Sequence, residues 1–274
     1  MEEIQNIYLG ALPERVDIRD YKLTYPITAT EFPDEFEIKP CAVKNQGSVG
    51  SCVAHAIAET IEYYNKVQDN ITKKMSVGFI YGNRRNSLNK GSGMYVREAL
   101  ANARKYGDVY LTDFNENKET PEIINLFEER YESLKDKAYP FRFSTYFRVK
   151  SDDDIKYALM NYGPVIFSMK WYSDIKVGAD GVITTTQDKN KIRGGHCMII
   201  YGWNEKGWKI QNSWGTTWGL NGQAILPYNI TKSECWGITD EIHADDDVVK
   251  PFNSKLLELL VKIVNFILNL FKKK

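Results

Sequence analysis

The pattern of apolar and polar residues divides the chain into a helical first half and a strand-rich second half. In the first half, apolar residues recur at steps of three and four, which is the period of a helix that buries one face. The pattern predicts helices over residues 51–68, over 95–106, and from Pro121 through Tyr131. Gly107 stands where the second of these helices would stop.

Beyond residue 139 the chain changes to short runs of β-branched and aromatic residues, which predict strands. These runs lie at residues 141–149, 165–169, 195–202, 208–211 and 223–226, with a short helix over 152–162. A helical half followed by a β half predicts an α+β fold of two lobes. We place the helical lobe at about 39–138 and the β lobe at about 139–242, and we expect an active-site cleft between them.

Both ends of the chain differ from these lobes. Residues 1–38 show little helical period and several prolines, so they predict an extended N-terminal arm. Acidic residues and a proline predict a linker over 243–252. Residues 253–274 then have polar positions at alternating steps of three and four, which predicts an amphipathic helix. The segment is too short and too interrupted to favour a membrane span. Docking on this protein or a second copy, and lying on a membrane surface, both stay open.

Composition narrows the function only slightly. The 274 residues are 43% hydrophobic and 26% charged, as in a folded globular protein. The 36 basic and 36 acidic residues balance, so no nucleic-acid partner is predicted. The acidic, polar start has no apolar core, which predicts no secretory signal.

Four scattered cysteines are too few for a disulfide scaffold in a chain of this length. Cys41 and Cys235 are then two free thiols or one bridge, and both readings stay open. No Cys-x-x-Cys or His-x-x-x-His spacing occurs, so neither a metal site nor another cofactor is predicted.

Candidate catalytic residues are concentrated at the start of the first predicted helix. Glycines and serines form a tight loop after Gln46, Ser51 is placed to cap the helix, and Cys52 falls in its first turn. The unpaired N–H groups and the dipole there favour an anion, so we expect a lowered pKa for the Cys52 thiol.

A thiol nucleophile needs a base, and the chain has three histidines. His55 lies on the apolar helix of Cys52 and is predicted to be a packed structural residue. His243 lies in the acidic linker. His196 begins a predicted strand, and a turn at 204–207 lets the next strand run beside it. Asn212, at the end of that next strand, could then hold the imidazole by its other ring nitrogen.

The sequence around Cys52, His196 and Asn212 resembles that of the papain-like (C1) cysteine peptidases. The resemblance rests on three motifs in this order: Gln46-Gly47-x-x-Gly50-Ser51-Cys52, Gly194-Gly195-His196, and Asn212-Ser213-Trp214-Gly215. It covers about residues 11–240. The likeness is nearer to bacterial or viral members than to animal cathepsins, which implies a cytoplasmic or a virus- or phage-associated location, with the C-terminal helix able to hold the protein at a membrane surface.

The resemblance implies a role for each matching residue. Cys52 would be the nucleophile, His196 the general base and then acid, and Asn212 the residue that orients His196. The side-chain amide of Gln46 and the backbone N–H of Cys52 would form the oxyanion hole. Trp214 would shelter the hydrogen bond between His196 and Asn212 from water. Trp214, Gly93 and Gly195 would also belong to the substrate-binding site. The substrates implied are peptides or proteins.

The chain departs from the family pattern at three positions near the site. Val49 stands where many members have a cysteine, Val53 where many have an aromatic residue, and Met94 where a second glycine often lies. We also hypothesise that residues 1–30 form a short inhibitory strap, because they are extended and rich in prolines.

Two other functions are weighed against hydrolysis. One is acyl transfer to an amine or thiol by the same catalytic set. The other is a catalytically silent papain-fold binding protein, which is disfavoured because Cys52, His196, Asn212 and Gln46 are all retained.

Overall fold

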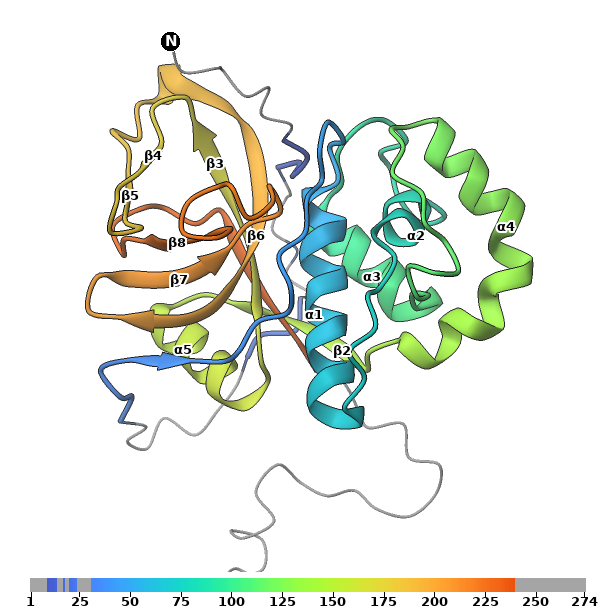
Figure 1. The fold of residues 1–274 in the computed structure, drawn as a ribbon, viewed down its shortest axis with the longest axis horizontal. Helices are drawn as coiled ribbons and strands as arrows, with labels where there is room; N and C mark the ends of the chain where they lie inside the picture. Colours follow the sequence, from blue (N-terminus) through green and yellow to red (C-terminus); the bar gives the residue numbers. More distant parts are fainter. Residues whose placement is uncertain (1–8, 14–16, 18–19, 24–30, 240–274) are drawn as a thin grey trace, which may run out of the picture. The chain divides into compact units, whose positions relative to one another are not determined.

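The computed structural model describes residues 9–13, 17, 20–23 and 31–239. The predicted linker over 243–252, His243 and the predicted amphipathic helix over 253–274 lie outside these residues. Within the described part, the helices before residue 139 gather on one side, and an antiparallel sheet with one further helix against it lies on the other, as Figure 1 shows. The α+β fold is therefore confirmed.

The helical lobe is built around its first helix. Its helices are α1 (Cys52–Asp69), α2 (Val77–Gly82), α3 (Val96–Tyr106) and α4 (Glu122–Ala138), followed by a 3₁₀ turn. All residues of α1 from Cys52 to Ile61 are buried, because the helix lies against β6 as well as against α2 and α3. The three predicted helices are confirmed. No pattern in the sequence predicted α2, because six residues are fewer than the window in which helical periodicity is detected.

The β lobe is one antiparallel sheet with the strand order β2-β9-β3-β6-β7-β8, in which β1 also pairs with β6. The strands are β1 (Phe36–Glu37), β2 (Thr145–Val149), β3 (Val165–Tyr172), β6 (Ile192–Asn204), β7 (Gly207–Gln211), β8 (Gln223–Leu226) and β9 (Glu234–Thr239). A separate hairpin joins β4 (Lys176–Val177) and β5 (Ile183–Thr184), and α5 (Asp152–Asn161) follows β2. β9 was not predicted, although it pairs with both β2 and β3.

The hairpin of β6 and β7 has the turn that the sequence predicts. Asn204 faces Gly207 across the turn, and Ile199 faces Gln211 further along. This register brings the residue after β7, Asn212, back toward the part of β6 that carries His196. The hairpin therefore sets the spacing of two predicted site residues.

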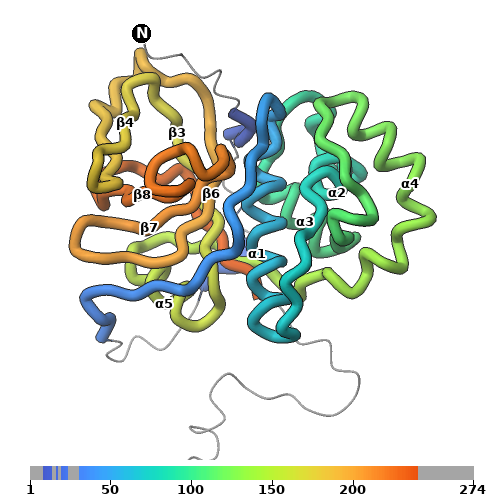
Figure 2. The backbone as a smooth tube through the Cα atoms, in the orientation of Figure 1, coloured from blue at the N-terminus to red at the C-terminus, as the bar shows by residue number. Residues whose placement is uncertain are grey.

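The described parts of the N-terminal arm are attached to both lobes. The Asp20 carboxylate lies 2.6 Å from Nη2 of Arg97 on α3 and 3.3 Å from Nε of Arg148 on β2. The backbone N–H of Arg148 also donates to the carbonyl of Tyr21 at 2.7 Å. In Figure 2, a shorter segment, residues 9–13, lies between β6 and the chain leading into α1.

Two features are absent from the described residues. No helix there combines the length and the apolar character needed to cross a bilayer. Likewise, no three His, Cys, Asp or Glu side chains of this part of the chain gather where they could hold a metal ion. All four cysteines are free thiols, so the alternative of a Cys41–Cys235 bridge is wrong.

A mostly buried ion pair attaches the chain before α1 to the helix itself. Lys44 Nζ lies 2.5 Å from Glu62 Oε1, and the same oxygen accepts the backbone N–H of Met75 at 2.6 Å. The Lys44 carbonyl accepts the backbone N–H of Gly215. This lysine, two residues before Gln46, thus links α1 to the β lobe.

We expect Glu62→Ala to lower the free energy of unfolding by about 3–5 kcal/mol, because it leaves a mostly buried ammonium without its nearest carboxylate. Chemical denaturation measures the change. The matched control is Glu128→Ala, which breaks an exposed pair with Arg85 and should cost about 0–1 kcal/mol. Equal losses in the two variants would contradict this account.

Candidate active site

Cys52 is the first residue of α1, and its thiol is fully buried. The loop before it turns tightly: the N–H of Val49 donates to the carbonyl of Gln46, and the N–H of Ser51 donates to the carbonyl of Val49. Ser51 occupies the N-cap position, but its side chain makes no capping bond. Its hydroxyl instead lies 3.2 Å from Nδ1 of His55, a ring that is itself buried, so the predicted N-cap position is confirmed but the side chain bonds elsewhere.

The imidazole of His196 is held by Asn212, and both side chains are fully buried. His196 Nε2 lies 2.8 Å from Asn212 Oδ1. The same oxygen accepts the backbone N–H of Ser213 at 2.7 Å, which identifies it as the amide oxygen. In the neutral ring Nε2 must therefore carry the proton. Nδ1, which has no hydrogen-bond partner within the described part of the chain, is left as the basic nitrogen.

Aromatic rings surround this histidine. Trp214 stacks on the imidazole with ring centroids 4.4 Å apart, and Trp171 meets it edge-on at 5.2 Å. Trp218 contacts both tryptophans. The rings keep water from the His–Asn bond, which is stronger in a medium of low dielectric. Trp171 was missed because only the pairing of β3 with β6, which sets Met169 opposite His196, brings it to the site.

Gln46 is held between the loop before Cys52 and the β lobe. Its Nε2 donates to the carbonyl of Val49 at 2.8 Å, and its Oε1 accepts from the Ser213 hydroxyl at 2.7 Å. The Gln46 backbone N–H also donates to the carbonyl of Ser213 at 2.8 Å. The Ser213 hydroxyl therefore fixes which end of the amide is the donor, a role that the sequence did not reveal.

Residues 9–13, which belong to the hypothesised strap over 1–30, lie between the lobes. From here on the name strap means residues 9–13 alone. The N–H of Ala11 donates to the carbonyl of Gly195 at 3.0 Å. On the helical side, Met94 accepts from Leu12 at 2.9 Å and donates to Gly10 at 2.7 Å. The strap thus pairs through its backbone with both sides, and it runs parallel to the chain at Met94.

Two glycines predicted to bind substrate lie against the strap. A Cβ on Gly195 would stand 2.1 Å from the carbonyl oxygen of Ala11. A Cβ on Gly93, whose φ is +78°, would stand 2.8 Å from the carbonyl oxygen of Gly10. A backbone can approach this closely only because neither residue has a side chain.

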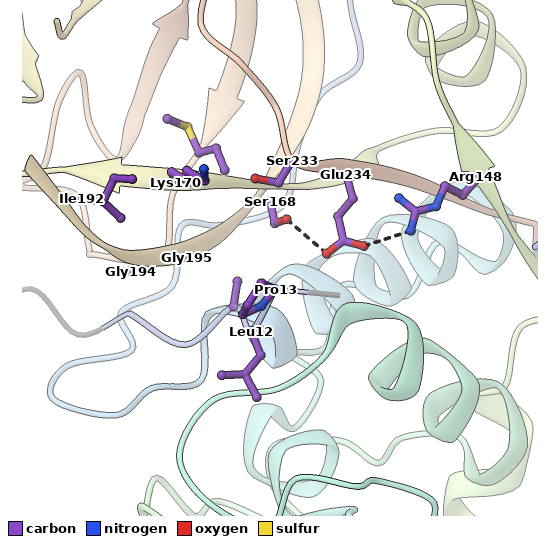
Figure 3. Close-up of a pocket in the computed structure, with 12 residues that line it drawn as sticks. Leu12, Pro13, Arg148, Ser168, Lys170, Ile192, Gly194, Gly195, Ser233 and Glu234 are labelled. Atoms are coloured by element: carbon purple, nitrogen blue, oxygen red, sulfur yellow. Dashed lines mark hydrogen bonds and ion pairs between the residues drawn. The ribbon is translucent and has the colours of Figure 1, made fainter. Parts of the chain in front are cut away.

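A cavity of about 420 Å³ lies between the strap and the sheet, as Figure 3 shows. Leu12 and Pro13 of the strap line one side of it. At one end the Glu234 carboxylate accepts from the Ser168 hydroxyl at 3.2 Å and lies 3.7 Å from the guanidinium of Arg148. The cavity therefore adjoins the strap where it passes Gly195, the residue before His196.

Burial sets the charge state of the two central groups. Desolvation raises the pKa of the Cys52 thiol to about 11, although the nearby backbone N–H groups of Cys197 and Gly10 oppose the rise. Desolvation lowers the pKa of His196 to about 4, against the effect of the hydrogen bond that His196 donates to Asn212. Thiol and imidazole are both neutral here. The expected lowering of the Cys52 pKa is thus wrong for this closed state, because exclusion of water outweighs the helix N-terminus.

The family profile described as papain family cysteine protease matches residues 32–244. The chain is 29% identical over 261 residues to an uncharacterized peptidase C1-like protein of Acanthamoeba polyphaga mimivirus, covering 83% of this chain and 82% of that protein. It is 30% identical over 237 residues to cathepsin B-like cysteine proteinase 3 of Caenorhabditis elegans, covering 77% of this chain and 60% of the nematode protein.

Solved structures of cysteine proteases share the fold. Xylellain, a cysteine protease from Xylella fastidiosa, matches with a TM-score of 0.75 at 24% identity, over 86% of this chain and 97% of that one. Digestive procathepsin L 3 of Tenebrio molitor larval midgut matches with a TM-score of 0.66 at 15% identity, over 85% and 76% of the two chains. At these identities the likeness concerns the fold.

We expect Cys52 in the intact chain to react slowly with iodoacetamide at pH 7. A thiol with a pKa of about 11 is only about one part in ten thousand thiolate at that pH. The rate should rise steadily as the pH increases toward 11, and peptide mass mapping would follow it for this residue alone. The same reaction in denaturant is the control, because there the pKa returns to near 9. A rate for the intact chain that is already at its plateau at pH 7 would contradict the assignment of a neutral thiol.

Proposed function

The chain belongs to the papain family of cysteine proteases, and we propose that it cleaves peptide bonds with Cys52 as nucleophile and His196 as general base. Family membership makes the protein a thiol hydrolase that acts on peptides or proteins. The observation that carries the residue assignment is the buried bond from His196 Nε2 to Asn212 Oδ1, which leaves Nδ1 as the basic nitrogen. The backbone N–H of Cys197, the next residue along the strand, is among the groups that lower the pKa of the Cys52 thiol, which places the thiol near this part of β6.

The reaction proceeds in two halves. His196 takes the thiol proton, and the Cys52 sulfur attacks the carbonyl carbon of the scissile bond. The oxyanion that forms is stabilised by the Gln46 side-chain amide and the Cys52 backbone N–H. The imidazolium gives its proton to the amine, the C–N bond breaks and a thioester remains. Water, deprotonated by His196, then attacks the thioester and releases the carboxylic acid and the thiol.

The first test follows intact mass during an exposure to an epoxysuccinyl inhibitor that is long enough for the closed cleft to open, alongside turnover of a peptide library. Wild type should gain one adduct and cleave peptides, whereas Cys52→Ala should do neither. Unchanged turnover in Cys52→Ala would overturn the assignment. The products are also examined with an added amine, because amide products in place of carboxylic acids would mean that acyl transfer replaces hydrolysis.

Gln46→Ala should lower kcat by about 100- to 1000-fold, as loss of one oxyanion donor does. The matched control is Gln68→Ala, the same change on an exposed side chain near the end of α1, which should leave kcat unchanged. Thermal unfolding of both variants separates a catalytic loss from a folding defect. Near-normal turnover by Gln46→Ala would remove Gln46 from the oxyanion hole.

We further propose that the strap keeps the cleft closed until it is displaced or cut. A substrate backbone between the lobes would need the groups of Met94 and Gly195 that now bond Gly10, Ala11 and Leu12. Strap and substrate therefore compete for one set of hydrogen bonds. The buried, neutral thiol is what a closed cleft requires.

Gly10→Ala should open the cleft without changing a catalytic residue. A Cβ at position 10 would stand 1.9 Å from the carbonyl oxygen of Gly50, so the strap has to move. A clash worth more than about 1.4 kcal/mol raises the open fraction about tenfold or more. Labelling of Cys52 by the epoxysuccinyl inhibitor should accelerate by that factor. Gly91→Ala, where the nearest atom would be a side-chain oxygen at 3.3 Å, is the control. Equal labelling rates for Gly10→Ala and wild type would rule out the strap as the barrier.

A further inference from the structure

A carboxylate outside the catalytic set reaches the nucleophile loop. Glu119 lies in the loop before α4 and is 69 positions away from Gly50 along the chain. Its Oε1 accepts the backbone N–H of Gly50, and the Ser92 hydroxyl lies 3.5 Å from the same atom. Its Oε2 accepts from the Tyr81 hydroxyl at 2.9 Å and from the backbone N–H of Thr120 at 3.3 Å.

The bond to Gly50 acts on the peptide group that positions Gln46. The N–H of Gly50 and the carbonyl of Val49 belong to one planar peptide unit. Glu119 holds the N–H end of this unit, and Gln46 Nε2 donates to its carbonyl end at 2.8 Å. If the carboxylate is lost, the unit can rotate, and the acceptor of the Gln46 amide moves with it.

The second oxygen of Glu119 reaches the cleft edge that bonds the strap. The Tyr81 hydroxyl, which donates to Glu119, accepts the backbone N–H of Gly93 at 3.2 Å. The carbonyl of Gly93 accepts from Nη1 of Arg84 at 2.7 Å, and Arg84 is buried. Both polar groups of Gly93 are therefore fixed, directly before Met94.

We propose that Glu119 is a positioning residue for the cleavage reaction, acting through Gln46. This inference rests on the proposed function. One carboxylate bonds the loop that carries the oxyanion donor and, through Tyr81, the edge on which an extended peptide would lie. Its principal effect is on kcat, because the donor must be in place when charge develops on the substrate oxygen. The effect through Gly93 on KM is smaller, since Arg84 still holds that residue.

The experiment compares full-length wild type, Glu119→Ala and Glu119→Gln, with rates expressed per site titrated by the epoxysuccinyl inhibitor. Glu119→Ala should lower kcat by about 10- to 100-fold, as small displacements of catalytic groups do, with KM changed by less than about threefold. Glu119→Gln keeps one acceptor oxygen and should lose less. The matched control, Glu122→Ala, removes an exposed carboxylate three residues away and should leave both constants unchanged.

A double-mutant cycle distinguishes positioning from a general effect on folding. If Glu119 acts through Gln46, then Glu119→Ala combined with Gln46→Ala is no slower than Gln46→Ala alone. If the two losses multiply, the inference is overturned. It is also overturned if Glu119→Ala keeps the wild-type kcat or if the loss falls mainly on KM. Should Glu119→Ala fail to fold, the same cycle is run with Glu119→Gln.

A wild-type chain that takes up the inhibitor but cleaves no peptide would instead overturn the proposed function itself.

Discussion

The hydrogen bond between His196 and Asn212 is the constraint on which the rest of the site depends. A buried imidazole can serve as a base only if one nitrogen is held as a donor and the other is left free to accept. Asn212 does this with one oxygen, whose direction is fixed by the backbone N–H of Ser213. The hydroxyl of the same serine orients Gln46. Ser213 therefore couples His196 to the proposed oxyanion donor, and Trp214 stacks on the imidazole.

Solvent access decides whether this arrangement is reactive. A helix N-terminus stabilises an anion by about 0.3–1 kcal/mol, which is less than one pKa unit. Burial raises the pKa of Cys52 from 9.0 to about 11 and is therefore the larger effect. The strap contributes to this burial, because its Gly10 lies against the sulfur and its backbone bonds both lobes. The same contacts that would exclude substrate thus also keep the Cys52 thiol neutral.

No disulfide holds the loop before Cys52, since all four cysteines are free. Hydrogen bonds between distant parts of the chain hold it instead. Gln46 and Glu119 bond opposite ends of the peptide unit of Val49 and Gly50, and Lys44 joins the start of the loop to Glu62 of α1. Such networks fix geometry because each buried or half-buried polar group has few alternative partners. The loop can therefore be well defined in a chain without cross-links.

The sequence by itself determined the features that depend on local pattern and residue type. The helical period and the signals of a helix start located α1 and placed Cys52 in its first turn. A predicted turn between two strand patterns located the hairpin that joins His196 to Asn212. Tertiary structure alone decided the contacts of Trp171 and Glu119, the place of β9 inside the sheet, and the position of the strap in the cleft. It also reversed the expected pKa shift of Cys52. The physical reason is the same in each case: desolvation and hydrogen bonding depend on which distant segments meet, and no periodicity along the chain records that.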